Sequence, residues 1–462
     1  MNIDYQQARL TRDSRFDGTF FIAVKTTRIF CRPICPANVP LEKNVEYFQL
    51  AQQAMLAGYR PCLRCRPDSA PHSNAWQGVN TTVQRAMRLV REYRELNIKE
   101  IAIKLGISTR YFRQLFQQHL GLSPKQYQLF DKVLFAKKLL HQSSLPIEHI
   151  ALASGFASAR RLQDNFKKVT GLTPQQIKQG KSMQSEQGEQ GEQGELISIR
   201  LAFRPPFNWQ HMQTFLALRA IQGIESVTEN GYSRTFVIGE DKGWFRVSVI
   251  QNKHYLKVEI RLPNIEKLTA VLSNIERMFD LNADTKTIQT QLLRCAVPED
   301  KIVIGLRIPG VWDTFEAGCR AILGQQISVK AAITLLTLLN KTLGETEGEH
   351  VYFVTAQAIM NSDLDFLKIP NSRKHTLRLF AQYNLSLKAQ TQLPEPSIDD
   401  WLNIKGIGPW TVSYGKMRGK SCPDIWLNTD LIVKKQLAKM NIDPELARPW
   451  RSYLTLQLWS MA

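Results

Sequence analysis

Apolar residues recur at helical spacing in two similar stretches between residues 80 and 180. The first stretch runs from Ile98 to Phe116 and the second from Ile147 to Phe166. Each predicts a periodic helix, a glycine at a turn, a serine that caps the next helix, and a second helix with arginines. One such stretch would fit any short helical hairpin, but two copies favour a tandem helix-turn-helix.

The pattern changes in the second half of the chain. Residues 196–275 alternate between apolar and polar positions, for example at Thr235–Ile238 and Trp244–Ile250, which predicts strands interleaved with helices. Helical periodicity dominates again from about Asp313, as in Ala317–Leu343. We therefore expect a multidomain protein that is mainly α with α+β parts.

A polar segment separates the two halves. It repeats Glu-Gln-Gly and has no apolar residue after Met183, so it predicts a flexible linker that leaves little rigid docking between the halves. We expect a cysteine-rich domain, the helix-turn-helix region, the linker, a small α+β domain and a final helical region, at residues 1–75, 80–180, 181–195, 196–275 and 276–462.

Charge is distributed unevenly along the chain. The net charge is +19, and residues 1–180 hold 27 Lys and Arg against 12 Asp and Glu, a net +15. Residues 181–195 contribute −3, and residues 196–462 contribute +7. A first part this basic indicates a partner that is a polyanion, such as nucleic acid, although a generic basic surface is the alternative.

The composition also indicates where the protein works. The sequence has no run of about 18 apolar residues, so it predicts no membrane-spanning helix. The N-terminus lacks the pattern of a secretory signal. We therefore expect a cytoplasmic protein that has no membrane partner. Thiols stay reduced in that compartment, so closely paired cysteines indicate metal ligands rather than disulfides.

Four of the seven cysteines form two pairs, Cys31-x3-Cys35 and Cys62-x2-Cys65, that can close a tetrahedral zinc site. Such a zinc can be purely structural, or one of its thiolates can act as a nucleophile. Four thiolates on Zn²⁺ carry a formal charge of −2, which repels DNA. Transfer of a methyl group to one thiolate would leave −1 and raise the affinity for DNA. Spacing alone leaves both alternatives open.

Two stretches, Phe16–Cys35 and Gly58–Asp68, closely resemble the N-terminal domain of the Ada response proteins. In that family all four cysteines bind one zinc, and the first of them irreversibly accepts a methyl group from a DNA methyl phosphotriester. The resemblance implies that Cys31 is this acceptor. The Pro-Cys-His-Arg motif of the C-terminal methyltransferase domain of Ada is absent, so reversal of O6-methylguanine is not implied.

The tandem helix-turn-helix resembles the AraC family, which follows the zinc domain in Ada. The resemblance implies binding to promoter DNA, with RNA polymerase as a further partner of a monomeric regulator. Six residues lie where recognition helices would face a major groove, with ordinary surface positions as the alternative. They are Thr109, Arg110, Arg113, Ser158, Arg160 and Arg161.

A Gly-Ile-Gly turn at Gly406–Gly408 lies between two predicted helices, where free backbone N–H groups can hold a DNA phosphate. An aspartate follows about 20 residues later, which is the layout of helix-hairpin-helix DNA glycosylases. The chain from Arg204 to Trp459 resembles the AlkA branch of that superfamily. The matching motifs are Phe279-Asp-Leu, Arg307-Ile-Pro-Gly, Arg320-Ala-Ile-Leu-Gly-Gln325 and Pro449-Trp-Arg-Ser-Tyr453.

The AlkA resemblance implies that Asp430 is the catalytic carboxylate, with Asp424 second to it. A carboxylate can stabilise the oxocarbenium-like sugar formed when an alkylated purine leaves and can orient water. Four aromatic residues would hold the flipped cationic base by stacking and cation–π attraction, or else would be plain core residues. They are Trp410, Tyr414, Trp459 and Phe215.

Further details of the reaction follow from the same resemblance. Trp410 occupies the position at which strand-cleaving relatives carry a lysine, so we expect a monofunctional glycosylase. Only Cys422 lies near the region where some relatives bind an iron–sulfur cluster, so we expect none. Gln326 stands where the family has an apolar wedge. A monovalent cation at the carbonyls of Leu402, Ile404 and Gly406 is a further expectation.

Two functional hypotheses remain at this stage. The first is a fused alkylation-response protein that accepts methyl groups at Cys31, switches transcription, and excises bases such as 3-methyladenine from double-stranded DNA. The second is a methylation-sensing regulator whose C-terminal part binds DNA without cutting it. Intact Asp430 and Trp410 favour the first hypothesis.

Overall fold

The computed structural model describes most of the chain. The described residues are 3–12, 16, 20–35, 37–48, 54, 57–62, 65, 82, 83, 85–87, 89, 90, 94, 96–179, 196–389, 397–440 and 442–461. The linker predicted at residues 181–195 and the boundary predicted between residues 75 and 80 lie outside them. Among the described helices, none combines the length and the apolar character needed to cross a membrane.

In its described residues, the N-terminal region contains a small sheet, the helix α1 (Ile3–Leu10) and the short 3-10 helix η2 (Glu42–Asn44). Its strand order is β3-β1-β2-β4, with β1 antiparallel to both β2 and β3 and with β2 parallel to β4. The strands are β1 (Phe21–Val24), β2 (Ile29–Cys31), β3 (Val45–Phe48) and β4 (Arg60–Pro61). Because β2 and β4 are parallel neighbours, the segments that follow them leave the sheet at the same edge.

The next region is helical, as the apolar periodicity predicts. Its two helix-turn-helix units are α4 with α5 and α7 with α8, joined by the long helix α6. Ser108 caps α5 and Ser158 caps α8, each by accepting a backbone N–H bond. The helices are α4 (Ile98–Leu105), α5 (Thr109–Leu120), α6 (Pro124–Gln142), α7 (Ile147–Ala153), α8 (Ala159–Thr170) and α9 (Pro174–Gln179).

A five-stranded antiparallel sheet follows, with strand order β5-β9-β8-β7-β6. Its alternating pattern confirms the predicted α+β region, since inward positions such as Phe245 and Val247 on β8 are fully buried. The elements are β5 (Ile197–Ala202), α10 (Trp209–Ala217), β6 (Glu225–Thr228), β7 (Gly231–Ile238), β8 (Asp241–Val249), β9 (Tyr255–Arg261), η3 (Ile265–Lys267) and α11 (Leu268–Met278).

The C-terminal part is almost entirely helical and builds two cores. One core lies around α13 to α17, and the other joins α10, α12, α18 and α19. The elements are α12 (Thr285–Arg294), η4 (Glu299–Lys301), α13 (Thr314–Gly324), α14 (Val329–Leu343), β10 (Thr346–Glu347), β11 (His350–Val351), α15 (Ala356–Met360), α16 (Asn371–Ala389), η5 (Ile398–Asn403), α17 (Pro409–Tyr414), the π-helix η6 (Gly415–Gly419), α18 (Leu431–Leu437), η7 (Pro444–Ala447) and α19 (Arg451–Ser460).

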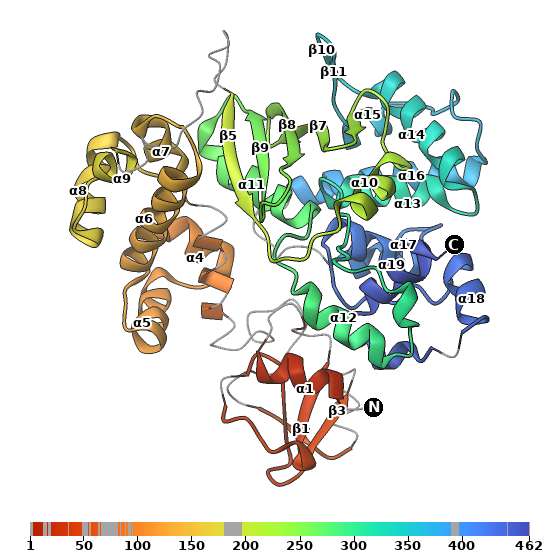
Figure 1. The fold of residues 1–462 in the computed structure, drawn as a ribbon, viewed down its shortest axis with the longest axis horizontal. Coiled ribbons are helices and arrows are strands. Elements are labelled where there is room, and N and C mark those ends of the chain that lie inside the picture. The colour runs from red at the N-terminus through yellow and green to blue at the C-terminus, as the bar shows by residue number, and fades with distance from the viewer. Residues whose placement is uncertain are drawn as a thin grey trace.

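The helix-turn-helix region and the five-stranded sheet share one hydrophobic core, contrary to the expectation of little rigid docking. Figure 1 shows α6 and α7 beside β5, and these helices also lie against η3 and α11. Lys138 Nζ forms an ion pair with Glu276 Oε1 at 3.0 Å, and Ser143 forms a β-bridge with Ile199. The expectation was wrong because the composition of a linker does not show whether the domains that it joins have apolar faces that pack together.

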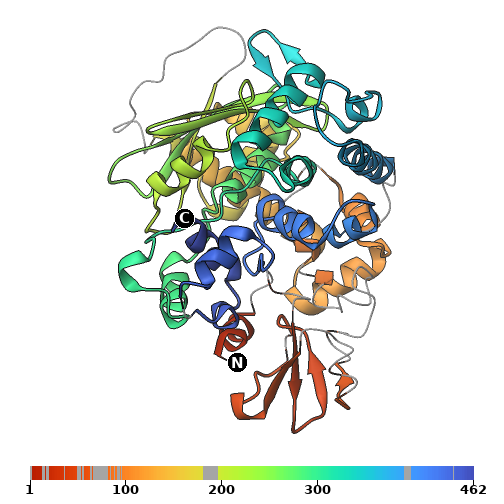
Figure 2. The same cartoon turned by 90° about the vertical axis from the view of Figure 1, so that its right-hand side faces the viewer.

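The N-terminal sheet also meets the C-terminal helices. Figure 2 shows α1 next to the C-terminal part of the chain, where it lies against η7. The guanidinium of Arg448 lies 5.3 Å from the ring centroid of Tyr5 on α1. This contact links the cysteine-rich region to the C-terminal part of the chain, which also contains Asp424 and Asp430.

Candidate functional site

The paired strands β2 and β4 bring the four cysteines together. Cys31 ends β2, Cys62 directly follows β4, and the Cys62 backbone N–H donates to the Phe30 carbonyl at 2.9 Å. All four sulfur atoms, those of Cys31, Cys35, Cys62 and Cys65, lie within 4.8 Å of one another. The sheet therefore assembles the two sequence pairs into one cluster.

The cluster has the dimensions of a tetrahedral zinc site. With Zn–S bonds of about 2.3 Å, the edge of a regular tetrahedron of sulfurs is about 3.8 Å, and Cys35 Sγ lies 3.9 Å from Cys62 Sγ. The Arg32 backbone N–H points at Cys65 Sγ, with the nitrogen 3.4 Å from the sulfur, as expected for a donor that supports a thiolate ligand. The four cysteines fit one Zn²⁺, which when bound holds sulfur in the reactive thiolate form at neutral pH.

The four cysteines differ in their exposure to solvent. Cys31 is half-buried, whereas Cys35, Cys62 and Cys65 are buried. The assignment of Cys31 as methyl acceptor stays a prediction, and it rests on its place as the first cysteine of the resemblance.

The predicted recognition residues lie at the start of α5 and of α8. Five of the six are exposed, and Thr109 is half-buried. Each recognition helix follows a glycine with positive φ, Gly106 at 69° and Gly155 at 76°, so the turn geometry requires this residue type. The starts of both helices are therefore accessible to a DNA groove. The six predicted recognition residues are Thr109, Arg110, Arg113, Ser158, Arg160 and Arg161.

The hairpin lies between η5 and α17 and presents exposed backbone. Gly406 has φ +92°, and Gly408 precedes the first helical residue of α17. The Gly406 carbonyl accepts a bond from Gln325 Nε2 at 3.1 Å, and the Lys405 carbonyl accepts one from Thr376 Oγ1 at 3.0 Å. These bonds fix the hairpin against α13 and α16. The cation expected at its carbonyls stays a prediction.

The two hairpin glycines should respond differently to alanine. A Cβ on Gly406 would lie 2.0 Å from Thr376 Oγ1 at a φ that strains any L-residue, so Gly406→Ala should cost about 1–3 kcal/mol of folding free energy. A Cβ on Gly408 would meet nothing within 4 Å, so Gly408→Ala should change stability by less than about 0.5 kcal/mol yet weaken DNA binding several-fold.

Thermal unfolding and DNA titration of the two variants test this difference. Wild-type DNA affinity in a stable Gly408→Ala variant would contradict a phosphate contact at that residue. Wild-type stability of Gly406→Ala would show that the Thr376 contact does not constrain the hairpin.

Asp430 lies directly before α18 and is held from four directions. Its Oδ1 accepts the Trp459 indole N–H at 3.1 Å and the backbone N–H groups of Ile432 and Val433 at 3.0 and 3.2 Å. Among the described residues, its Oδ2 accepts one hydrogen bond, from the Trp410 indole N–H at 3.4 Å. Three donors therefore orient one oxygen and leave the other with capacity for a further partner.

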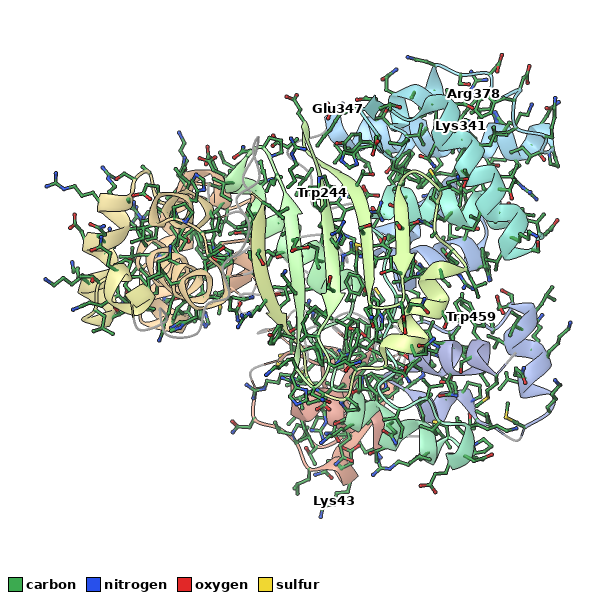
Figure 3. All side chains as sticks on the ribbon, turned by 45° about the horizontal axis from the view of Figure 1, so that its top comes forward. Lys43, Trp244, Lys341, Glu347, Arg378 and Trp459 are labelled. Carbon is green, nitrogen blue, oxygen red and sulfur yellow. The ribbon has the colours of Figure 1, made fainter. Side chains whose placement is uncertain are left out.

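The four predicted pocket aromatics lie around this carboxylate in two stacked pairs. Trp410 and Tyr414 on α17 have ring centroids 5.3 Å apart and an interplanar angle of 25°. Phe215 on α10 and Trp459 on α19 have centroids 6.1 Å apart and an angle of 18°. Figure 3 marks Trp459 at the meeting of α10 with the C-terminal helices. Phe215 is buried, whereas the other three are half-buried.

Two arginines beside these rings are absent from the sequence prediction. The guanidinium of Arg219 lies 3.8 Å from the Phe215 ring centroid, and that of Arg418 lies 4.8 Å from it. Arg418 also donates from Nη1 to the Tyr414 hydroxyl at 3.0 Å. Each arginine follows its aromatic partner by four residues, and this spacing was the available signal.

The other two candidates lie apart from the pocket rings. Asp424 is buried in an ion-pair network, with its Oδ1 2.6 Å from Arg451 Nε and its Oδ2 3.6 Å from Arg448 Nη1. Burial raises the pKa of its carboxyl, and Arg451 opposes that shift. Gln326 is exposed in the turn between α13 and α14 with φ +57°, so this wedge candidate projects from a strained backbone.

Comparison with known proteins agrees with this division of the chain. Residues 4–68 match the metal binding domain of Ada, residues 101–180 match a helix-turn-helix domain, and residues 198–313 match the AlkA N-terminal domain. A "Probable bifunctional transcriptional activator/DNA repair enzyme AlkA" of Mycobacterium tuberculosis is 29% identical over 97% of this chain and 94% of the relative.

Two shorter relatives each match one half. "DNA-3-methyladenine glycosylase 2" of Escherichia coli is 31% identical over 56% of this chain and 95% of its own length. "Bifunctional transcriptional activator/DNA repair enzyme AdaA" of Bacillus subtilis is 33% identical over 38% of this chain and 83% of its own length. The fold and its sites define a multidomain DNA-repair protein with a zinc-binding domain and a paired helix-turn-helix. The chain belongs to the Ada and AlkA families and fuses an Ada-like part to an AlkA-like part.

Proposed function

We propose that this protein repairs alkylated DNA in two ways and reports the damage through its helix-turn-helix units. The AlkA-like part hydrolyses the N-glycosidic bond of alkylated purines such as 3-methyladenine, and Cys31 removes methyl groups from phosphotriesters. The observation that carries the first activity is the Asp430 carboxylate, held by the indoles of Trp410 and Trp459 within the aromatic pocket.

Base excision requires the target nucleotide to leave the stack and enter the pocket. The half-buried faces of Trp410, Tyr414 and Trp459 supply surfaces on which an extruded purine can stack. As the bond from the sugar to the base breaks, its electron pair stays with the base, and positive charge develops on the sugar. Asp430 Oδ2 stabilises that charge and orients the water that adds to the sugar, with the proton passing to solvent or base.

The reaction should end with an intact DNA strand. Opening the strand by a Schiff base requires an amine at the sugar, and the position that would supply it holds the Trp410 indole. We therefore infer a monofunctional DNA-3-methyladenine glycosylase that leaves an abasic site. The oriented carboxylate supports this activity over a purely DNA-binding role, because binding alone needs no such group in the pocket.

At the zinc cluster, the thiolate of Cys31 attacks the methyl carbon of a phosphotriester. The new S–CH3 bond forms as the CH3–O bond breaks, and the electron pair remains on the phosphate, which becomes an ordinary diester anion. The protein keeps a thioether and is not regenerated. The formal charge of the metal cluster changes from −2 to −1, so the N-terminal part is repelled less by DNA and should bind its promoter more tightly.

Analysis of the products formed from methylated duplex DNA tests the proposal. The wild-type protein should release free 3-methyladenine and leave a strand that breaks only after alkali, and it should also acquire labelled methyl. Methyl transfer without base release would support the alternative of a regulator that binds DNA and does not cut. Strand breakage without alkali would contradict the monofunctional assignment.

A further inference from the structure

Arg219 places a positive charge beside the aromatic pocket. It follows α10, and its guanidinium covers the Phe215 ring at 3.8 Å and lies 6.0 Å from the Trp459 ring centroid. It is electrostatically coupled to Tyr414 and to Asp430. An extruded base held near Asp430 would therefore meet a guanidinium as well as aromatic faces.

The donors of Arg219 are largely unused. Among the described residues, its guanidinium forms no ion pair, and its one hydrogen bond reaches the Phe215 carbonyl from Nη1 at the long distance of 3.4 Å. The neighbouring Arg320, by contrast, lies 2.5 Å from Glu225 and 2.7 Å from Glu316. The ion pairs of Arg320 account for its place in the fold, whereas most N–H groups of Arg219 have no hydrogen-bond partner among the described residues.

Arg219 stays charged at the pH at which the protein works. Burial lowers its pKa to about 10, with nearby Tyr414 and Asp430 opposing that shift and Arg418 and Arg320 adding to it. A pKa of about 10 leaves the guanidinium protonated at neutral pH. A partly desolvated charge of this kind interacts more strongly with a ligand than a charge on the open surface.

The charge of the departing base differs between two classes of lesion. An N3- or N7-alkylated purine is cationic and leaves as a neutral base, so it develops no negative charge that a nearby guanidinium could stabilise. An uncharged modified base keeps the bonding electron pair and leaves with negative charge. A guanidinium stabilises that charge as it develops, in the way that preorganised donors stabilise an oxyanion.

We infer that Arg219 is a specificity-determining residue that favours the excision of uncharged modified bases, by donating hydrogen bonds to the base as it departs with negative charge. The inference rests on the proposed glycosylase function and names the residue that distinguishes neutral lesions with acceptor atoms from cationic alkylpurines. The aromatic faces can stack on bases of both classes, whereas Arg219 assists only the departure of uncharged bases.

Single-turnover release of two bases from matched duplexes tests the inference. Hypoxanthine is the uncharged probe and 7-methylguanine the cationic one. Arg219→Gln should lower hypoxanthine release by about 10²-fold, as loss of one preorganised donor does, and should change 7-methylguanine release by less than about tenfold. Arg219→Lys keeps the charge and should retain more hypoxanthine activity than Arg219→Gln.

The outcomes separate this inference from the function on which it rests. Equal losses on both bases would assign Arg219 a structural role, and equal activities of the Lys and Gln variants would show that charge is not what acts. Either result overturns the inference while 7-methylguanine release by the wild type still supports the glycosylase. Release of neither base by the wild type would overturn both.

Discussion

Replacement of Asp430 by asparagine should lower the single-turnover release of 3-methyladenine by about 10²–10⁴-fold. The variant removes the negative charge from Oδ2, the oxygen that only the Trp410 indole contacts. An amide oxygen can still accept the bonds now made to Oδ1, so the start of α18 should remain formed. The loss should therefore appear in the chemical step, with DNA affinity close to that of the wild type.

A second aspartate provides a matched control for this substitution. Asp443 is exposed, and its side chain accepts the Glu445 backbone N–H at 2.9 Å, at the start of η7. Asp443→Asn changes the same functional group at the start of a helix outside the pocket, and it should release base at the wild-type rate. Equal base release by Asp430→Asn and the wild type would remove Asp430 from the mechanism.

The local features of this fold could be predicted from sequence because their causes are local. Ser108 and Ser158 cap helices that directly follow them, and Gly106 and Gly155 adopt the positive φ that each turn requires. Alternation likewise predicted strands within residues 196–275, and these strands form the five-stranded sheet. In each case, the residues that specify the element lie within it or beside it, so neighbouring positions carry the signal.

The pocket was predicted only as far as its motifs extend. Trp410, Tyr414 and Asp430 lie within one short stretch around the hairpin, and the resemblance covers them together. Arg219 follows α10, almost 200 residues earlier in the chain, and its four-residue spacing from Phe215 was a signal that the sequence analysis did not use. A prediction of aromatic faces alone therefore gave a pocket suited to cations, whereas the folded pocket also contains positive charge.

The docking of the two halves was missed for a related reason. Apolar residues of α6 and α7 satisfy the periodicity of an amphipathic helix whether they face their own bundle or a neighbouring sheet. Sequence patterns identify an apolar face but not what covers it. The shared core, together with the contact of Tyr5 with Arg448, places the Ada-like part against the AlkA-like part at two positions.

Replacement of Cys31 by alanine should abolish the transfer of labelled methyl from phosphotriester DNA to the protein. The variant removes the only sulfur that the family resemblance assigns as acceptor and leaves Cys35, Cys62 and Cys65 within one cluster. Loss of one ligand should weaken zinc binding, so zinc content and thermal unfolding are measured alongside transfer. The glycosylase, whose pocket lies in the other half, should keep releasing base.

The wild-type protein supplies evidence that does not depend on how the variant folds. Peptide mapping after reaction should place one added methyl group on Cys31 and none on Cys35, because the family resemblance assigns the first cysteine as the acceptor. Cys422→Ser, which changes a half-buried cysteine outside the cluster, should transfer label as the wild type does. Label on Cys31→Ala, or a methyl group mapped to another cysteine of the cluster, would show that a different sulfur accepts the methyl group. A wild-type protein that binds zinc but acquires no label would show that the zinc site is purely structural.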